Sequence, residues 1–161
     1  MTATITGLTL ADVAVGDELP ELRYEVSATT IVVGALATRD SRPQHHDFQF
    51  ATERNGLKNI FLSSPNQLAW FERYLTDWTG PTGRLGRLSF RMTESVYPGD
   101  TMVFTATVAA VDTDDVDCGW VEVEIALRVG TTTCTICKGR IAVPVTPDDN
   151  PWARRGERWQ P

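Results

Sequence analysis

The chain has 161 residues, 42% of them hydrophobic and 22% charged, which is ordinary for a globular protein and excludes an intrinsically disordered one. Its length suits one domain with a substantial core. The formal net charge of -6 disfavours non-specific binding to nucleic acid, and no apolar run approaches the ~20 residues that a membrane span needs. Residues 1–10 lack the basic and apolar parts of a signal peptide, so we expect a cytoplasmic protein that binds neither nucleic acid nor membrane.

One strand and two short helices are predicted in the first third of the chain. Residues 19–26 alternate apolar and polar side chains, which is typical of a strand. Thr29 or Thr30 can cap the next segment as a helix. Pro43 prevents this helix from running further, because the residue before a proline avoids helical geometry. Residues 47–54 predict a second short helix.

The segment from residue 67 to residue 78 carries the strongest helical pattern. Its apolar side chains recur at spacings of three and four, and Gly80-Pro81 ends it. A stripe this wide and aromatic indicates a helix embedded in a curved sheet. Aromatic stripes more often belong to the core than to an acyl pocket, although both interpretations apply here. The stripe consists of Leu68, Trp70, Phe71, Tyr74, Leu75 and Trp78.

Four long strands are predicted in the second half of the chain, where Val, Ile, Thr and aromatic residues are abundant. A long apolar helix followed by such strands predicts the α+β class, with an antiparallel sheet wrapped around the helix. The open edges of that sheet favour pairing with a second subunit. We expect one domain over residues 1–161, with its core at about 15–145 and a polar tail at 148–161 lying over a surface or a partner. The predicted strands cover residues 88–96, 101–111, 119–129 and 133–145.

The cysteines Cys118, Cys134 and Cys137 are predicted to be reduced packing residues, because the number is odd and no export signal is present. Cys134 and Cys137 have the CxxC spacing of zinc and redox sites, but no second ligand pair has suitable spacing. They also lie in a predicted strand, where residues i and i+3 face opposite sides.

An acid and a histidine, Asp40 and His45, stand five positions apart across a connection that contains Pro43. Such a connection can turn both side chains towards one point, whereas a straight helix cannot do so at this spacing. A carboxylate and an imidazole suit the deprotonation of water and the protonation of a carbon near neutral pH. Two other interpretations stay open. One is a surface loop in which Asp40 or Asp47 caps a helix, and the other is a metal site at His45, His46 and Asp47, whose adjacent ligands converge poorly on one ion.

This segment resembles the D-x-N-P-x-H-x-D-x-x-F-A signature of MaoC-like (R)-specific enoyl-CoA hydratases. Residues 15–20 resemble the usual entry of this family to its first strand, and residues 97–101 resemble its turn between core strands. The resemblance therefore extends over most of the chain, as far as about residue 145. The matching signature positions are Asp40, Pro43, His45, Asp47, Phe50 and Ala51.

A narrower resemblance, carried by residues 45–47, 59–61 and 73–78, is to actinobacterial chains that form the catalytic half of steroid side-chain enoyl-CoA hydratases. The family resemblance implies a hot-dog fold and hydration of an enoyl-CoA to a 3-hydroxyacyl-CoA of R configuration, here with a bulky or steroid-type acyl group. It implies no cofactor and no metal, since the CoA thioester is the substrate. It also implies assembly as a homodimer or as a heteromer with a second MaoC-like chain.

The resemblance implies a role for each matching residue. Asp40 would orient and deprotonate the attacking water, and His45 would share that water and the proton delivered to the α-carbon. Backbone N–H groups near Ser63 and Ser64 would stabilise the developing oxyanion at the start of the central helix, although ordinary N-capping also accounts for these serines. Arg42 stands where the signature has Asn, and it could contact a CoA phosphate or remain solvated.

Two further basic residues, Arg84 and Arg87, could form an anion-binding lip or an exposed basic turn. Two other functions remain open for the chain. An acyl-CoA thioesterase of the same fold would use a similar acid on the central helix. A non-catalytic partner subunit would complete the substrate tunnel of another chain. Retention of both Asp40 and His45 argues against the partner role.

Overall fold

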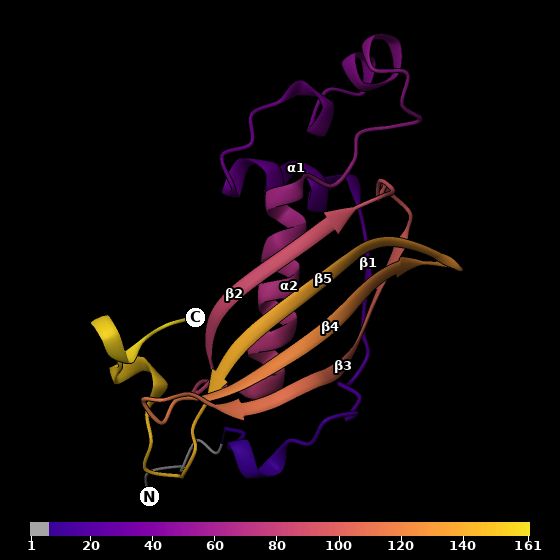
Figure 1. Cartoon of the computed structure of the whole chain (residues 1–161). Coiled ribbons are helices and arrows are strands. Elements are labelled where there is room, and N and C mark those ends of the chain that lie inside the picture. Colours follow the sequence, from indigo (N-terminus) through magenta and orange to yellow (C-terminus); the bar gives the residue numbers. More distant parts are fainter. Residues whose placement is uncertain (1–6) are drawn as a thin grey trace, which may run out of the picture.

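The computed structural model describes residues 7–161. The first six residues, part of the segment in which we expect no signal peptide, lie outside the described residues. Five strands pair antiparallel in one sheet, in the order β1-β3-β4-β5-β2 (Figure 1). The strands are β1 (Leu22–Glu25), β2 (Arg84–Met92), β3 (Thr101–Thr113), β4 (Gly119–Val129) and β5 (Thr132–Val143). The two α-helices are α1 (Ala28–Ala37) and α2 (Ser64–Thr79).

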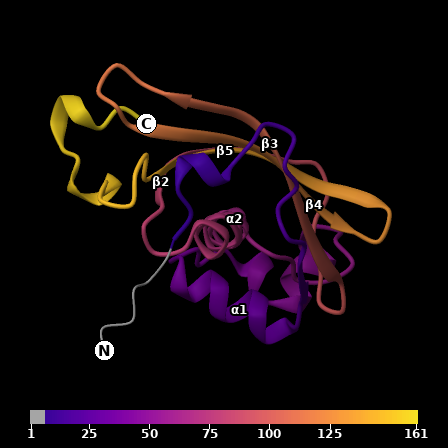
Figure 2. The ribbon, with the colours of Figure 1, turned by 90° about the horizontal axis from the view of Figure 1, so that it is seen from below.

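The sheet, α2 and α1 form three successive layers. Figure 2 shows α2 nearly end-on beneath the curved sheet, with α1 on the far side of α2. Phe71 and Leu75 of α2 are completely buried, and the Phe71 ring packs edge-on against Phe104 of β3, with ring centroids 5.3 Å apart. This arrangement confirms the predicted α+β class and hot-dog fold. Among the described residues, no helix has the length and apolar character needed to cross a membrane.

Side chains of the central strands alternate between the face that packs on α2 and the outer face. On β3, for example, Met102, Phe104 and Val108 are buried, whereas the intervening Thr105 and Thr107 are not. Because each buried apolar side chain contributes roughly 1.5–3 kcal/mol, this alternation fixes the register of the sheet. The core interpretation of the aromatic stripe is confirmed for Phe71 and Tyr74, while Trp70 and Trp78 are partly buried at its margin.

Both α-helices begin earlier than predicted because serines cap them. The prediction that Thr29 or Thr30 caps α1 was wrong. Ser27 is the N-cap, and its Oγ accepts a hydrogen bond from the Thr30 N–H at 3.0 Å while Thr30 Oγ1 accepts one from the Ser27 N–H at 3.3 Å, a capping box. Helix α2 starts one residue after Ser63, whose Oγ accepts a hydrogen bond from the Asn66 N–H.

Strand β2 was predicted at residues 88–96 but runs from Arg84 to Met92. The Arg84 and Arg87 backbones pair with Ala142 and Arg140 of β5, so the prediction of a basic turn at these arginines was wrong. A bulge between Leu85 and Arg87 had hidden the alternation that marks a strand.

The other short elements follow the predictions more closely. Residues 50–54 form a π-helical turn, Phe50–Arg54, within the short helix predicted at 47–54. The tail from residue 148 onward packs against one end of the sheet, where Trp159 stacks near Trp120 at 5.0 Å between ring centroids. In this structure Trp159 of the tail therefore lies against the sheet of the same chain.

Candidate active site

Asp40 and His45 meet at the end of α1. Their closest side-chain atoms, Asp40 Oδ2 and His45 Nε2, are 3.4 Å apart, and the two side chains are 14% and 3% exposed. The chain leaves α1 through Arg39, which has the left-handed φ of 57°, and then forms a 3-10 turn, Pro43–His45. The Asp40 N–H donates to the Ala35 carbonyl at 2.9 Å, which anchors the carboxylate at the helix end. The kinked connection therefore brings the acid and the imidazole together as the sequence predicted.

The far side of the His45 ring is held by the segment that leads into α2. Nδ1 lies 2.8 Å from the carbonyl oxygen of Phe61, and the Phe61 ring packs edge-on against the imidazole at 4.6 Å. A carbonyl oxygen only accepts hydrogen bonds, so Nδ1 carries the hydrogen. In the neutral imidazole, Nε2 then has a free lone pair and faces Asp40.

The start of α2 lies at the same place. Asp40, Arg42 and Ser64 line one open hollow of about 520 Å³. Ser63 is buried with its hydroxyl engaged as the N-cap, so ordinary capping accounts for that side chain. Ser64 is exposed, and no acceptor within residues 7–161 takes its backbone N–H. An unused N–H at a helix N-terminus, reinforced by the helix dipole, suits a developing negative charge.

The remaining polar groups of this segment have structural or peripheral positions. The backbone N–H of Arg42 donates to Asp40 Oδ1 at 3.4 Å, while its side chain is exposed at the rim of the hollow. Asp47 accepts a hydrogen bond from the Phe50 N–H at 3.0 Å and so caps the following helix, and His46 is exposed. Within residues 7–161, no group of three His, Cys, Asp or Glu side chains is placed to hold a metal ion.

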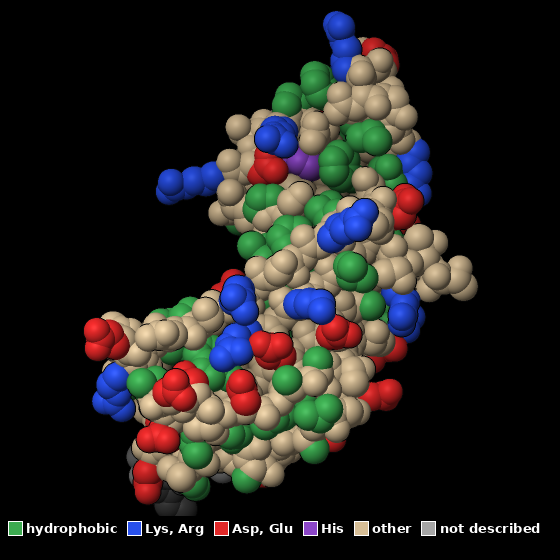
Figure 3. All heavy atoms as spheres, in the orientation of Figure 1, with side chains coloured by type: hydrophobic (Ala, Val, Ile, Leu, Met, Phe, Trp, Pro, Cys, Tyr) green, Lys and Arg blue, Asp and Glu red, His purple; other side chains and the backbone are tan. Residues whose placement is uncertain are grey.

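The hollow beside Asp40 opens at the surface, because Arg42 and Ser64, two of the residues that line it, are exposed. Figure 3 shows histidine as one small purple area on the upper part of the molecule, beside basic and acidic side chains and close to apolar ones.

Arg84 does not form an anion-binding lip. Its guanidinium lies over the Trp159 ring, 3.5 Å from the centroid, and donates to the carbonyl oxygens of Pro151 at 3.1 Å and Arg154 at 3.0 Å. Burial, followed by the nearby Arg155 charge, lowers the pKa of Arg84. Arg87 is exposed on the outer face of β2. The structure therefore engages Arg84 with the tail and leaves Arg87 exposed, and neither arginine lines the hollow beside Asp40.

The three cysteines are free and buried. Burial raises the pKa of each thiol above its ordinary value, and that of Cys137 to about 12. A thiol with a raised pKa is a poor nucleophile and a poor metal ligand. The interpretation of all three as packing residues is confirmed.

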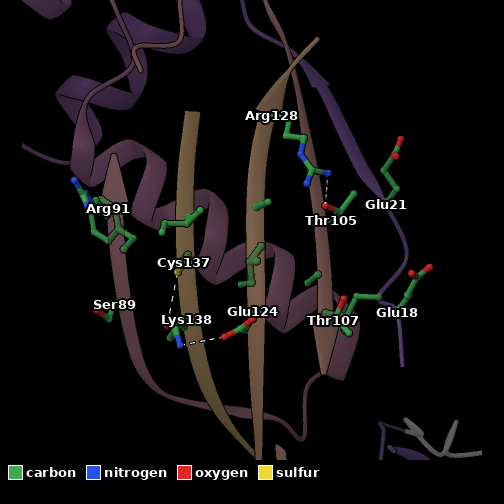
Figure 4. A pocket seen from close by; sticks show the side chains of 16 residues that line it. Glu18, Glu21, Ser89, Arg91, Thr105, Thr107, Glu124, Arg128, Cys137 and Lys138 are labelled. Carbon is green, nitrogen blue, oxygen red and sulfur yellow. Dashed lines mark hydrogen bonds and ion pairs between the residues drawn. The ribbon is translucent and has the colours of Figure 1, made fainter. Parts of the chain in front are cut away.

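A larger hollow, of about 870 Å³, lies on the outer face of the sheet (Figure 4). Two of its charged side chains pair with each other, and a third contacts a neutral hydroxyl. Lys138 pairs with Glu124 at 3.0 Å, and the Arg128 guanidinium approaches the Thr105 hydroxyl at 3.4 Å. Neither Asp40 nor His45 lines it, and its walls contain no histidine. The larger of these two hollows is therefore not the one beside Asp40.

Comparison with known proteins finds no family model that matches the chain. The 3-oxo-4,17-pregnadiene-20-carboxyl-CoA hydratase beta subunit of Mycobacterium tuberculosis is 39% identical over 98 residues, which span 61% of this chain and 75% of that protein. The crystal structure of the ChsH1-ChsH2 complex from Mycobacterium tuberculosis matches 81% of this chain and 98% of the compared chain, with a TM-score of 0.75 and 31% identity. A MaoC-like dehydratase from Rhodospirillum rubrum matches 85% of this chain and 97% of that chain, with a TM-score of 0.73 and 22% identity, and so supports the same fold.

Proposed function

The chain belongs to the MaoC-like hydratase family, among the steroid side-chain hydratase subunits, and on that premise we propose that it is itself catalytic and hydrates an enoyl-CoA at Asp40 and His45. One observation carries the proposal. Two shielded acid-base groups, Asp40 Oδ2 and His45 Nε2, lie 3.4 Å apart beside the N-terminus of α2. Hydration of a conjugated thioester needs an acid-base pair next to hydrogen-bond donors for the thioester oxygen.

The proposed reaction uses each of these groups. A water molecule donates one hydrogen to Asp40 and the other to the lone pair on His45 Nε2. Transfer of one proton to the pair lets the water oxygen form a bond to the β-carbon, and the electron pair of the double bond moves towards the thioester oxygen. The Ser64 N–H and the α2 dipole stabilise that oxygen. The pair then returns a proton to the α-carbon, and because it titrates as a unit, the proton belongs to both groups.

The product of this addition is a 3-hydroxyacyl-CoA, proposed to have the R configuration. No cofactor enters the balance, because water supplies both the hydroxyl group and the hydrogen. We propose a cytoplasmic enzyme with a bulky, steroid-type acyl-CoA as substrate. The name of the Mycobacterium tuberculosis relative, a hydratase of a 3-oxo pregnadiene CoA ester, supports that substrate class.

A second chain is the proposed partner. The relative is named a beta subunit, and one of the matching solved structures is a complex of two differently named chains. A heteromer with a second MaoC-like chain is therefore favoured over a homodimer.

Incubation of the purified full chain, in the assembly in which it purifies, with crotonyl-CoA and with a steroid-type enoyl-CoA tests this function. Hydration removes the enoyl absorbance and leaves the thioester intact. Release of free thiol would identify a thioesterase and overturn the proposal. Absence of both changes, with the partner chain present, would identify a non-catalytic subunit and also overturn it. Mass measurement of the co-purified complex identifies the partner.

A further inference from the structure

The hollow beside Asp40 offers little to an apolar acyl group. It is lined by residues 38–42 together with Ser64 and Pro65, which present mainly polar and charged groups. Sites that bind large apolar ligands are lined mainly by hydrophobic and aromatic side chains. The acyl part of a bulky substrate therefore needs a second surface that adjoins this hollow.

A groove with mainly apolar walls runs along the line where α1 and α2 meet, which we call the seam. Its volume is about 500 Å³, within the ~300–1,000 Å³ that small-molecule sites occupy. Val33 of α1 contributes one wall and is 56% exposed, a large apolar side chain with little cover. Ala69 and Trp70 of α2 form the opposite wall, and Tyr24 of β1 closes the side with its ring 4.4 Å from the Trp70 ring.

This groove and the hollow beside Asp40 lie end to end on the same seam. They are separated by the contact between Gly34 and Asn66, where a Cβ on residue 34 would overlap the Asn66 side chain. Asn66 directly follows Ser64 and Pro65 on α2, and Thr38 donates a hydrogen bond to the Gly34 carbonyl at 2.7 Å one turn along α1. Asn66 also donates a hydrogen bond to the Thr30 carbonyl at 3.3 Å, so an acyl group attached at the Asp40 hollow reaches the groove by passing over Asn66.

The far end of the groove carries a cation. The Arg73 guanidinium lies over the Trp70 ring, 5.0 Å from its centroid, and its Nε bonds Asp77 at 3.1 Å. The remaining N–H groups of Arg73 have no acceptor within residues 7–161. Arg73 lies nine residues after Ser64, which corresponds to ~13 Å along α2. That span fits a rigid fused-ring skeleton better than a short linear chain.

We propose that the α1-α2 groove binds the acyl group of the substrate, a rigid polycyclic apolar group whose distal acceptor oxygen bonds Arg73. The inference rests on the proposed function for the attachment of this acyl group to a CoA thioester. Its closing experiment uses a ligand that cannot be hydrated, so that binding in the groove is measured independently of turnover.

The probe is the CoA ester of a saturated 3-oxo steroid carboxylic acid, titrated calorimetrically into the full chain in the assembly in which it purifies. Val33→Trp fills the groove and should weaken binding at least ~10-fold, as loss of an apolar site does. Leu36→Trp is the matched control, because Leu36 is also a large exposed apolar residue of the same helix and lines neither hollow. This variant should bind the probe as the wild type does.

A second comparison tests the distal contact. The wild type should prefer the 3-oxo ester over its 3-deoxy analogue by ~10-fold or more, the usual worth of a hydrogen bond to a charged donor. Arg73→Gln should lose most of that preference, and Glu72→Gln, an exposed neighbour outside the groove, should keep it.

Several outcomes would overturn the groove assignment. They are equal binding by the Val33 and Leu36 variants, failure of the wild type to bind the probe, and persistence of the 3-oxo preference in Arg73→Gln. If crotonyl-CoA is hydrated while any of these holds, the groove assignment fails and the reaction stands. If the probe binds as described but no enoyl-CoA is hydrated, the reaction fails and the groove stands.

Discussion

His45 Nδ1 lies 2.8 Å from the carbonyl oxygen of Phe61, sixteen residues later in the chain. This bond ties the connection that carries Asp40 and His45 to the segment that leads into α2, so the imidazole and the helix N-terminus are positioned together. It also selects the tautomer, because the carbonyl requires a hydrogen on Nδ1. The lone pair on Nε2 then faces Asp40, where the attacking water is proposed to bind.

The tautomer of His45 is a direct prediction of this contact. Neutral His45 should carry its hydrogen on Nδ1, and long-range ¹H–¹⁵N correlation spectra of the labelled protein distinguish the two tautomers. His46, which is exposed, provides an internal reference in the same spectra. A hydrogen on Nε2 of neutral His45 would contradict the proposed binding of water.

Much of the geometry of the Asp40–His45 segment could be predicted from the sequence, because the residues that determine it are close together in the chain. Pro43 and the spacing of Asp40 and His45 are enough to indicate two side chains turned to one point. The part played by Phe61 could not be predicted, because a backbone carbonyl leaves no side-chain signal. The capping of α1 by Ser27 was available in the pattern of a serine followed three residues later by a threonine, but the later threonines drew the prediction away from it.

The tail was harder to predict because its contacts are distant in sequence. In the sequence, Arg84 is a charged residue close to two glycines, a pattern that does not indicate its contacts. In the structure it lies between Trp159 and the carbonyl oxygens of Pro151 and Arg154. The α1-α2 groove was also hard to predict, because the residues that form it are distant in sequence. Val33 and Trp70 belong to separate helical patterns, and the crossing of Gly34 with Asn66 brings them to one seam.

Removal of the Arg84 contacts should loosen the tail. Arg84→Gln removes the cation-π contacts with Trp152 and Trp159 and two hydrogen bonds, and for a partly exposed group we expect the free energy of unfolding to fall by roughly 1 kcal/mol. Limited proteolysis should cut within residues 148–161 faster than in the wild type. Arg87→Gln, on the same strand but exposed, is the control and should leave both measurements unchanged. If proteolysis cuts residues 148–161 at the same rate in Arg84→Gln and Arg87→Gln, Arg84 does not hold the tail.

The free energy of unfolding should fall at alkaline pH, because the folded chain holds buried groups such as Cys137 and Tyr74 in their protonated forms. Burial raises the pKa of Cys137 from 9.0 to about 12 and that of Tyr74 from 10.0 to about 12, the latter with a smaller contribution from Glu21. The folded state therefore binds more protons than the unfolded state above the unfolded pKa values, so stability is complete below about pH 9 and falls as the pH rises towards 12.

Urea unfolding from about pH 8 to about pH 11 measures this loss. Cys137→Ala lacks one of the groups with a raised pKa, while Cys118, Cys134 and Tyr74 remain, and it should show a shallower decline with pH, whatever its stability at neutral pH. A decline as steep as that of the wild type would mean that Cys137 does not titrate with unfolding.

The most direct test of the catalytic pair is the rate of enoyl-CoA hydration in Asp40→Asn, His45→Ala and His46→Ala, with circular dichroism to confirm that each variant is folded. Loss of one acid-base group should lower turnover by at least ~100-fold in the first two variants. His46→Ala, which changes the exposed neighbour only, should retain the wild-type rate. Near-normal hydration by a folded Asp40→Asn or His45→Ala variant would contradict the assignment of the reaction to this pair.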